Sequence, residues 1–511
     1  MGITSLNFLI FLFLLIAGYY ILPSKIRWIL LLIASVVYIG LSGNVILLLY
    51  PVITIGVTWG CSNRIETIRE KANPGEEQKK CKVFLVLAVV FDVAVLFVLK
   101  YANMGIYTFN AISGRTMSGV KNLEPLHFLI PMGLSFYTLS IVGYMFDVYY
   151  GVGKAEKNYL KLLLFGTYFP LLVSGPIIRY RETGVMLTKE HHLEYKNLTY
   201  GAQRILWGFF KVLIISERLA IVVNTIFSDS DTYYGAYVII AAFGFTLQLY
   251  TNFSGSMDIV LGISQMLGVE LPENFRQPFF SETIQEFWQR WHITLGAWLR
   301  DYIMFPILRT NTFSGLKDRL KTKCGKKKAN HITTYLAMLI LWFIAGLWHG
   351  GAWKYVWGVG LLQGIYIIVG EVIGNSRNNK KNSSEKAGRC LPILRRLRTF
   401  VLISIAFVFF RADSLTQGLV FLSKFFKSWS LFSGETGKLG LDTVDWMILL
   451  VSLLVLLCVS ILQQKANITE RLARTNIVLR WCILFAGLFA VIIFGNYGPG
   501  YDAAEFIYQG F

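Results

Sequence analysis

The most regular feature of the chain is a series of long apolar segments separated by shorter polar ones. Roughly ten to twelve stretches approach the length of about 20 apolar residues that a helix needs to cross a bilayer. The runs are continuous rather than alternating, so they predict helices and not the strands of a membrane barrel. We expect an all-α, polytopic membrane protein with additional re-entrant or amphipathic helices. Clear apolar segments are Leu6–Leu22, Val83–Leu99, Ile332–Leu347, Val359–Ile373, Trp446–Leu462 and Ile477–Phe494.

Composition supports this class, because 55% of the 511 residues are hydrophobic and only 15% are charged. So few charges could not cover the surface of a soluble protein of this size. We find no long repeat and no separate soluble domain, and we interpret residues 1–511 as a single membrane domain. The first apolar stretch lacks a basic leader and a small-residue cleavage site, so we expect a retained span in a multi-pass protein of the plasma membrane.

Three polar segments are rich in lysine and arginine, and they predict which loops face the cytoplasm. The net charge of +19 would favour nucleic acid in a soluble chain, but no nucleic-acid recognition motif accompanies it. Basic loops of membrane proteins stay on the cytoplasmic side, beside anionic lipid. We therefore place these three segments there and the acidic loop at residues 228–231 outside. The basic segments are Ser62–Lys82, Ser314–Asn330 and Asn375–Arg398.

This topology predicts where one histidine lies. The span Ile332–Leu347 leaves the second basic segment and Ala352–Ile373 returns to the third, so together they form a hairpin that opens away from the cytoplasm. His349 follows the cytoplasmic start by roughly 25 Å of helix, at 1.5 Å per residue. We expect His349 at membrane depth or near the outer side.

His349 and His292 are the strongest candidates for chemistry among the six histidines. Each follows a tryptophan in apolar sequence, and ionisable residues at membrane depth usually have a function. Glycines around His349 allow close approach of backbone or substrate, and a neutral histidine is a suitable general base for a hydroxyl. The alternative is a helix-end histidine bonded to a carbonyl. The other four have ordinary interfacial interpretations: His127, His191, His192 and His331.

His292 lies in an aromatic segment that we predict to be an amphipathic helix. In a helix, Trp288, His292 and Leu295 would share one face. The alternative is that tryptophan and Arg290 merely anchor the segment at the membrane interface. The six cysteines are scattered without paired spacing, so we predict no metal or redox site.

Several motifs together resemble those of membrane-bound O-acyltransferases. Residues 285–292 (QEFWQRWH), followed by 298–302 (WLRDY), resemble that family's signature, and 348–350 (WHG) resemble its second histidine motif. The alginate O-acetyltransferase branch is the most similar. Its other motifs match at 131–137, 147–149, 175–180, 274–279 and 409–412, whereas the match at 253–259 is looser at Ser256 and Met257.

The resemblance implies helices around a central tunnel, with His349 as the main catalytic residue and His292 as its partner. A thioester donor, acetyl-CoA or a similar acyl-CoA, would enter from the cytoplasm as co-substrate, with no permanently bound cofactor. The acceptor would approach from outside, as a polysaccharide or through a partner acyltransferase. The residues expected to line or support the tunnel are Asn252, Ser254, Asp258, Trp288, Arg290, Trp291, Arg300, Asp301 and Trp348.

The end of the chain adds a candidate acyl carrier. Residues 505–511 (EFIYQGF) resemble a terminal motif of this branch and of the small partner protein in teichoic acid D-alanylation, in which a tyrosine is proposed to accept the acyl group. The resemblance thus implies that Tyr508 relays acyl groups within a tail at about 496–511. The alternative is an amphipathic tail docked on the membrane surface.

Three functions remain open from the sequence. The first is acetyl transfer for O-acetylation of an extracellular or cell-wall polysaccharide. The second is D-alanyl transfer to teichoic acid, against which the built-in C-terminal motif argues. The third is a polysaccharide transporter without chemistry, although the chain shows no pair of matching broken helices in two halves, which such proteins often have.

Overall fold

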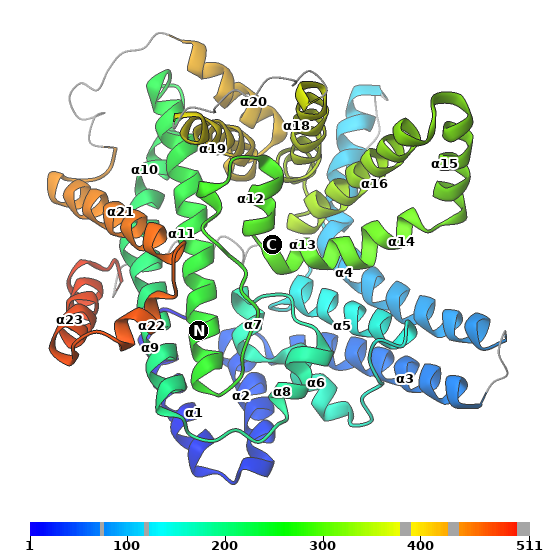
Figure 1. Ribbon diagram of the computed structural model, residues 1–511, viewed down its shortest axis with the longest axis horizontal. Helices are drawn as coiled ribbons and strands as arrows, with labels where there is room; N and C mark the ends of the chain where they lie inside the picture. Colours follow the sequence, from blue (N-terminus) through cyan, green and yellow to red (C-terminus); the bar gives the residue numbers. More distant parts are fainter. Residues whose placement is uncertain (72–75, 117–121, 379–389, 428–438, 498–511) are drawn as a thin grey trace. The chain divides into compact units, whose positions relative to one another are not determined.

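The computed structural model describes residues 1–71, 76–116, 122–378, 390–427 and 439–497 (Figure 1). The described residues are mostly helical and contain no β-strand, only an isolated bridge between Phe275 and Trp291. The prediction of an all-α fold is therefore confirmed.

The chain divides into two compact units, which we describe separately. Among the described residues, the first comprises those within 1–209 and 255–272, and the second those within 210–254 and 273–497. The long helix α11 (Ala236–Met266) contributes to both. The other main helices of the first unit are α1 (Leu6–Ile21), α2 (Arg27–Ser42), α3 (Leu49–Lys71), α4 (Glu76–Thr116), α5 (Leu134–Tyr149), α6 (Tyr159–Thr167), α7 (Phe169–Ser174), the π-helix η3 (Tyr180–Gly184), α8 (Val185–Leu187) and α9 (Tyr195–Phe209).

The second unit contains the histidine motifs. Its helices before the third basic segment are the π-helix η4 (Phe210–Ser216), α10 (Glu217–Ser228), α12 (Ile284–Arg290), α13 (Ile293–Leu299), the π-helix η6 (Arg300–Met304), α14 (Phe305–Leu308), α15 (Asn311–Cys324), α16 (Lys326–His349), α17 (Trp353–Tyr355), the π-helix η7 (Val356–Leu361) and α18 (Leu362–Asn378). The later helices are α19 (Cys390–Arg411), α20 (Leu415–Ser423), α21 (Thr443–Gln463), α22 (Ile468–Ala473) and α23 (Ile477–Phe494).

Eight helical segments of the described residues are long and apolar enough to cross a membrane, and three shorter apolar helices accompany them. This agrees with the predicted multi-pass membrane protein. The eight segments are Ser24–Ser42, Val45–Lys71, Glu77–Ser113, Ala236–Met266, Lys326–His349, Trp353–Gly374, Thr443–Gln463 and Ile477–Phe494.

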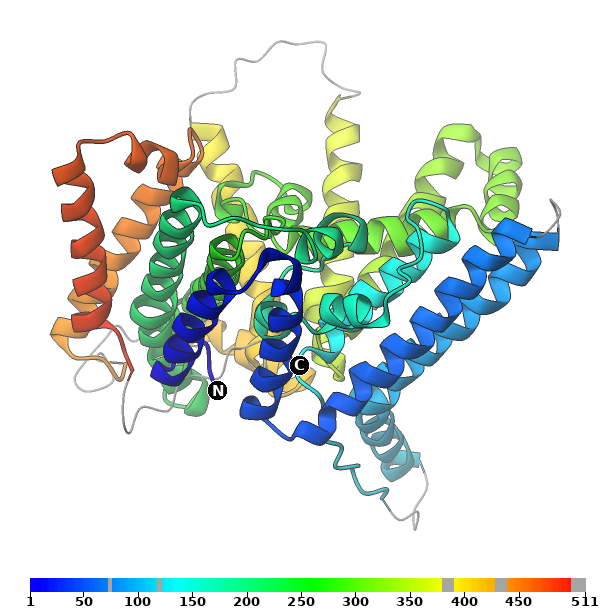
Figure 2. The same cartoon turned by 90° about the horizontal axis from the view of Figure 1, so that it is seen from below.

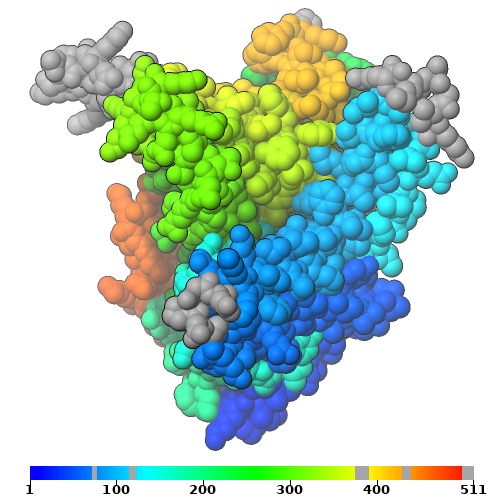
Figure 3. Space-filling view, turned by 90° about the vertical axis from the view of Figure 1, so that its right-hand side faces the viewer, coloured from blue at the N-terminus to red at the C-terminus, as the bar shows by residue number. Residues whose placement is uncertain are grey.

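The helical hairpin α3–α4 shows how such segments meet lipid. The two helices pack side by side in antiparallel directions (Figure 2), and their outer surfaces are the blue and light-blue spheres of Figure 3. Val83, Leu87 and Val90 recur on one face of α4, and each is more than half exposed. Polar groups turn inward, where Thr58 donates a hydrogen bond to Asp92 at 2.7 Å. An apolar exterior over a polar interior contact is the pattern expected in a bilayer.

The prediction of polar loops was wrong for much of the basic sequence. In the first basic segment, α3 continues to Lys71 and α4 begins at Glu76. The second forms α15 and the start of α16, interrupted by Gly325 at φ 82°. Lysine, arginine and glutamate are good helix formers. A basic segment can therefore be helical as well as polar.

The predicted hairpin around His349 is confirmed. Helix α16 ends at His349, and the chain returns through α17, η7 and α18. Glycines permit the close packing of α16 on η7. A Cβ atom on Gly346 would lie 2.7 Å from the Cα of Val356, and one on Gly360 would lie 2.7 Å from the carbonyl oxygen of Trp342.

Candidate active site

His349 occupies the last position of α16 and is 2% exposed. Its ring centroid lies 5.1 Å from that of Trp348 and 6.0 Å from that of Phe410 on α19. The next residue, Gly350, has no room for a side chain, because an added Cβ would lie 2.4 Å from the ring of Tyr355. The Trp-His-Gly sequence thus places the imidazole at a tightly packed helix end.

His292 does not lie within a helix, so the predicted face shared with Trp288 and Leu295 is wrong. Helix α12 ends at Arg290, and α13 begins at Ile293. His292 adopts a left-handed conformation between them, with φ 48° and ψ 51°. Such a conformation is uncommon outside glycine and is often associated with functional sites.

Asn274 holds His292 from a distant part of the sequence. The Nδ1 atom of His292 lies 3.3 Å from Oδ1 of Asn274, which also accepts hydrogen bonds from the backbone and hydroxyl of Thr294, each at 3.0 Å. The backbone N–H of Thr294 can only donate, so the asparagine atom at this point is its oxygen. Nδ1 must therefore carry the proton. In the neutral ring, Nε2 then has the lone pair of a base.

Burial keeps the His292 ring neutral. His292 is 1% exposed, and burial lowers its pKa to about 3. Protonation at neutral pH would place a charge in a low-dielectric interior. A neutral imidazole with a fixed tautomer is suited to accept a proton or a hydrogen bond through Nε2.

The two histidines lie near one another inside an aromatic enclosure. Their ring centroids are 6.4 Å apart. Trp348 contacts both, with its ring centroid 5.6 Å from that of His292 and 5.1 Å from that of His349. Phe253 on α11 closes another side, with its centroid 5.0 Å from that of His292. The structure thus brings three predicted site residues together: His292, Trp348 and His349.

Two further predicted tryptophans support this enclosure. Trp291 is 1% exposed, and its ring stacks on Phe287 at 5.4 Å between centroids. Trp288 donates a hydrogen bond from Nε1 to the buried side chain of Gln363 at 3.1 Å, which fastens α12 to α18. Both residues hold the chain in place just before the turn at His292.

Charged residues near the signature motif have a different setting. Arg290 forms an ion pair with Glu286 at 2.6 Å, with both side chains about one-third exposed. Arg300 pairs with its neighbour Asp301 at 3.0 Å and is 56% exposed. These contacts are those of helix-surface ion pairs, each of small energetic value.

The polar residues of α11 divide between the two units. In the second unit, Asn252 and Ser254 are buried, and Ser254 accepts a hydrogen bond from Nζ of Lys211 at 2.9 Å. Asp258 belongs to the first unit, where it forms an ion pair with Arg204 at 3.0 Å.

Lys211 was missed by the sequence interpretation. It is 4% exposed on η4, and it contacts the helix turn that carries Phe253. Its signal was present, because it is a single cation within the apolar run from Trp207 to Ile215. Asn274 was included only as part of a motif. Its contact with His292 could not be read from the sequence.

Tyr508 lies outside the described residues, but the structure shows where the preceding segment is attached. The backbone N–H of Asn496 donates to the carbonyl of Leu213 on η4 at 3.0 Å. Arg218 donates to the terminal carbonyl of α23, that of Phe494, at 2.7 Å, and pairs with Asp445 on α21 at 3.0 Å. The described part of the C-terminal segment is thus tied to the π-helix that carries Lys211.

Comparison with known proteins gives this arrangement a context. The family model described as the membrane-bound O-acyltransferase family matches residues 155–410, which include both histidines. The chain is 32% identical to the probable alginate O-acetylase AlgI of Azotobacter vinelandii over 414 residues, covering 80% of this chain and 75% of that protein. It is 27% identical to a peptidoglycan O-acetyltransferase of Helicobacter pylori, covering 66% and 63% of the two chains. It is 29% identical to a teichoic acid D-alanyltransferase of Bacillus subtilis, covering 56% and 70%.

Proposed function

Because the chain belongs to the membrane-bound O-acyltransferase family, we propose that it transfers acetyl groups from acetyl-CoA at the cytoplasmic side toward an extracellular or cell-wall polysaccharide. The observation that carries the proposal is the pair of buried imidazoles 6.4 Å apart. Relatives named for O-acetylation of alginate and of peptidoglycan support a polysaccharide as the final acceptor.

The proposed chemical step is attack of a hydroxyl oxygen on the thioester carbonyl. His349 removes the hydroxyl proton, and the oxygen forms the new ester bond as the carbon–sulfur bond breaks. The leaving thiolate then takes the proton from the imidazolium of His349, which restores the neutral base. His292 orients the hydroxyl through Nε2, since its Nδ1 atom is held by Asn274 at 3.3 Å. General base catalysis of this kind contributes about 10²–10⁴ in rate.

Tyr508 is the proposed first acceptor. An acyl-tyrosine would divide the overall transfer into two steps, one with the thioester and one with the final acceptor. The phenol, with an ordinary pKa of about 10, gives up its proton to a base more readily than a sugar hydroxyl does. In the second step, the acceptor hydroxyl attacks the tyrosyl ester and regenerates the phenol. A partner acyltransferase outside the membrane would catalyse that step.

The attachment of the C-terminal segment supports this role. Tyr508 follows Asn496 by only twelve positions in the sequence. Twelve residues reach at most roughly 40 Å when extended. Asn496 is hydrogen-bonded to η4. Lys211 of the same η4 is hydrogen-bonded to Ser254, whose neighbour Phe253 contacts the ring of His292.

Transfer of D-alanine is the second candidate, favoured by the similarity to a teichoic acid D-alanyltransferase. That similarity covers 56% of this chain, compared with 80% for the alginate relative. The nature of the acyl group on the product decides between the two. A transporter without chemistry would consume no thioester.

The test uses the purified full chain in nanodiscs with labelled acetyl-CoA. We expect thioester consumption and an acetyl ester on the peptide that contains Tyr508, detected by mass spectrometry. The ester should be absent from His349→Ala and Tyr508→Phe protein, and present in Tyr497→Phe protein as the matched control. Normal polymer acylation by Tyr508→Phe protein would rule out the relay. No thioester consumption by the wild type with any acyl donor would rule out the enzyme.

A further inference from the structure

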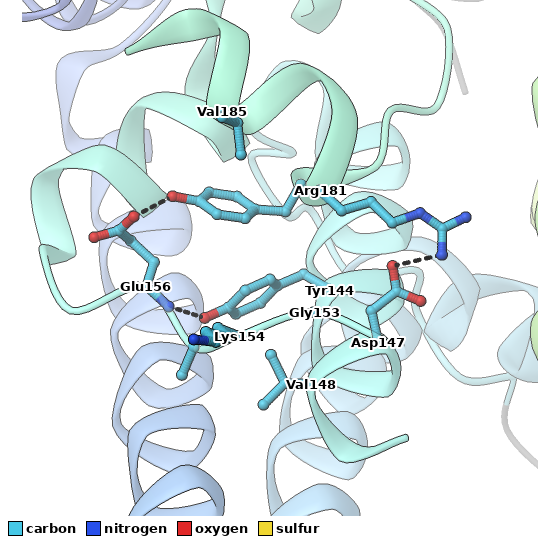
Figure 4. A pocket seen from close by; sticks show the side chains of 10 residues that line it. Tyr144, Asp147, Val148, Gly153, Lys154, Glu156, Arg181 and Val185 are labelled. Carbon is cyan, nitrogen blue, oxygen red and sulfur yellow. Dashed lines mark hydrogen bonds and ion pairs between the residues drawn. The ribbon is translucent and has the colours of Figure 1, made fainter. Parts of the chain in front are cut away.

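A polar pocket lies in the first unit, and its lining includes none of the residues assigned to acyl transfer. It has a volume of about 320 Å³ and is formed by the end of α5, the loop before α6 and the π-helix η3 (Figure 4). Such a volume is at the lower limit for small-molecule sites. The polar residues that line it are Tyr144, Asp147, Lys154, Glu156, Tyr180 and Arg181.

The pocket joins two motifs that the proposed transfer does not use. Asp147 and Val148 belong to one segment that resembles the acyltransferase branch, and Tyr180 belongs to another, more than thirty positions later. The two segments meet in this pocket. A binding site would explain why both carry polar side chains at a helix end.

One wall of the pocket is closed by internal hydrogen bonds. The hydroxyl of Tyr180 donates to a carboxylate oxygen of Glu156, and the other oxygen accepts from the backbone of Asn158 at 2.7 Å. The backbone N–H of Glu156 donates to the hydroxyl of Tyr144 at 2.9 Å. Both carboxylate oxygens of Glu156 are therefore engaged, and the two tyrosine rings form a fixed aromatic wall at 5.1 Å between centroids.

The cations of the pocket are held less tightly. Arg181 extends toward Asp147 on one side, while Lys154 lies on the other, beside Tyr144 and Glu156 (Figure 4). The nearest approach of Arg181 to Asp147 is 3.9 Å, and the arginine side chain is 36% exposed. No ion pair of Lys154 is found among the residues that the structure describes. Arg181 also pairs through Nε with its exposed neighbour Glu182 at 3.3 Å. The terminal nitrogens of its guanidinium and Nζ of Lys154 can therefore meet an incoming anion while that pair stays in place.

The pocket lies beside the basic end of the α3–α4 hairpin. Arg69, in the last turn of α3, donates to the carbonyls of Val148 at 3.0 Å and Tyr149 at 2.7 Å. This end carries the first basic segment, which the distribution of charge assigns to the cytoplasm. A ligand would therefore reach the pocket from the cytoplasm or from the headgroups of the inner leaflet.

We propose that this pocket binds the phosphoryl group of an organic phosphate. The planar guanidinium of Arg181 presents a fork of N–H donors that matches phosphoryl oxygens, and Lys154 adds a second positive charge. The rings of Tyr144 and Tyr180 provide an apolar wall for the organic part. Two sources supply this chemistry at the cytoplasmic side: a soluble nucleotide phosphate and a phospholipid headgroup. The assignment does not depend on the chemistry at His349.

The experiment titrates adenosine bisphosphate into the full chain in phosphatidylcholine nanodiscs and measures binding by calorimetry. A second arm compares the melting temperature in phosphatidylcholine nanodiscs with that in nanodiscs containing phosphatidylglycerol. Arg181→Gln removes the fork of donors. Gly153→Leu fills the pocket without altering charge, since a Cβ on Gly153 meets only Asp147, at an ordinary 3.9 Å. Lys189→Gln, an exposed cation nearby that does not line the pocket, is the matched control.

We expect one of the two phosphates to bind, with an affinity at least about tenfold lower in both pocket variants and unchanged in the control. Variant-sensitive calorimetric binding identifies the soluble phosphate. A variant-sensitive rise in melting temperature with phosphatidylglycerol identifies the lipid. Binding that is equal in wild type and both pocket variants would mean a site elsewhere and would overturn the proposal. Failure of both phosphates to bind the wild type would overturn it as well.

Discussion

The ring centroid of His292 lies 6.4 Å from that of His349, although one residue caps a short helix and the other ends a long one. One oxygen atom between two such rings can be within hydrogen-bonding range of both. In the proposed reaction that oxygen is the attacking hydroxyl. The two residues then have separate tasks, proton removal by His349 and orientation by His292.

Replacing His349 by alanine should reduce thioester consumption by about 10²–10⁴-fold, because the general base is lost. The protein should remain folded, as judged by its melting temperature and elution profile. His331→Ala is the matched control. His331 lies on the same helix, its side chain is 37% exposed, and its contact with Glu371 is long, at 3.7 Å. Normal turnover in His349→Ala protein would refute the assignment of the base.

His292→Asn should reduce turnover and cost less stability than His292→Ala, because asparagine tolerates the left-handed conformation at φ 48°. His292→Ala removes the same ring but introduces a residue that this conformation disfavours by about 1–2 kcal/mol. Melting temperatures of the two variants separate backbone strain from chemistry. If His292→Asn turns over as fast as wild type, the ring serves only to hold the segment.

Acid should destabilise the protein partly through His292. Its pKa is about 3 in the folded protein and about 6.5 when exposed. Between these two pKa values the unfolded chain binds more protons than the folded protein. The free energy of unfolding therefore falls as the pH falls, by up to about 1.4 kcal/mol per pH unit. Above about pH 6.5 this residue makes the free energy of unfolding independent of pH. We expect a smaller decrease in melting temperature for His292→Asn between about pH 7 and pH 5. Identical decreases in the two proteins would contradict burial of a neutral imidazole.

Gly346→Ala should destabilise the hairpin that ends at His349. The added Cβ would lie 2.7 Å from the Cα of Val356 and 2.8 Å from the carbonyl of Tyr355, and backbone atoms must move to accept it. Overpacking of this kind costs typically about 1–3 kcal/mol. Gly370→Ala on α18 is the control, since no heavy atom lies within 4 Å of its added Cβ. Equal melting temperatures for the two variants would show that α16 and η7 can separate without cost.

Arg218→Gln should weaken acyl transfer to the tail more than it weakens binding of the donor. It removes the bond to the carbonyl of Phe494 and the ion pair with Asp445, which together fix the exit from α23. A tethered acceptor acts at an effective concentration in the millimolar range, so a free peptide of residues 497–511 at that concentration should restore transfer. If the peptide does not restore transfer, Arg218 supports the fold of the unit rather than the position of the tail.

The spans and the histidine at the helix end could be predicted because their causes are local. The apolar run from Ile332 to Leu347 predicts a helix, and the structure extends it to Lys326–His349. Lysine favours a helix, which accounts for the extra turns at its start. An ionisable residue in apolar sequence is unusual enough to identify His349 without a structure.

The conformation of His292 could not be predicted, because a distant segment sets it. Its local sequence has the pattern of an amphipathic helix. The structure interrupts that helix with the bridge between Phe275 and Trp291 and with Asn274, whose side chain binds Nδ1 and the start of α13. Long-range hydrogen bonds thus outweigh local propensity at this position. For Lys211, the sequence signals a buried cation but not its partner, because Ser254 lies on another helix.

Helix α16 connects lipid composition to the depth of the base. Its first residues are the lysines at 326–328, which we expect among the headgroups, and its last is His349. Its apolar part, Ile332–His349, measures about 27 Å, close to a typical hydrocarbon core of about 30 Å. In a thinner bilayer this part would be longer than the core, and a greater tilt of α16 is one way to relieve that mismatch. Acyl-chain length would then alter the distance between His349 and the outer surface, and with it the distance that an acyl group must travel.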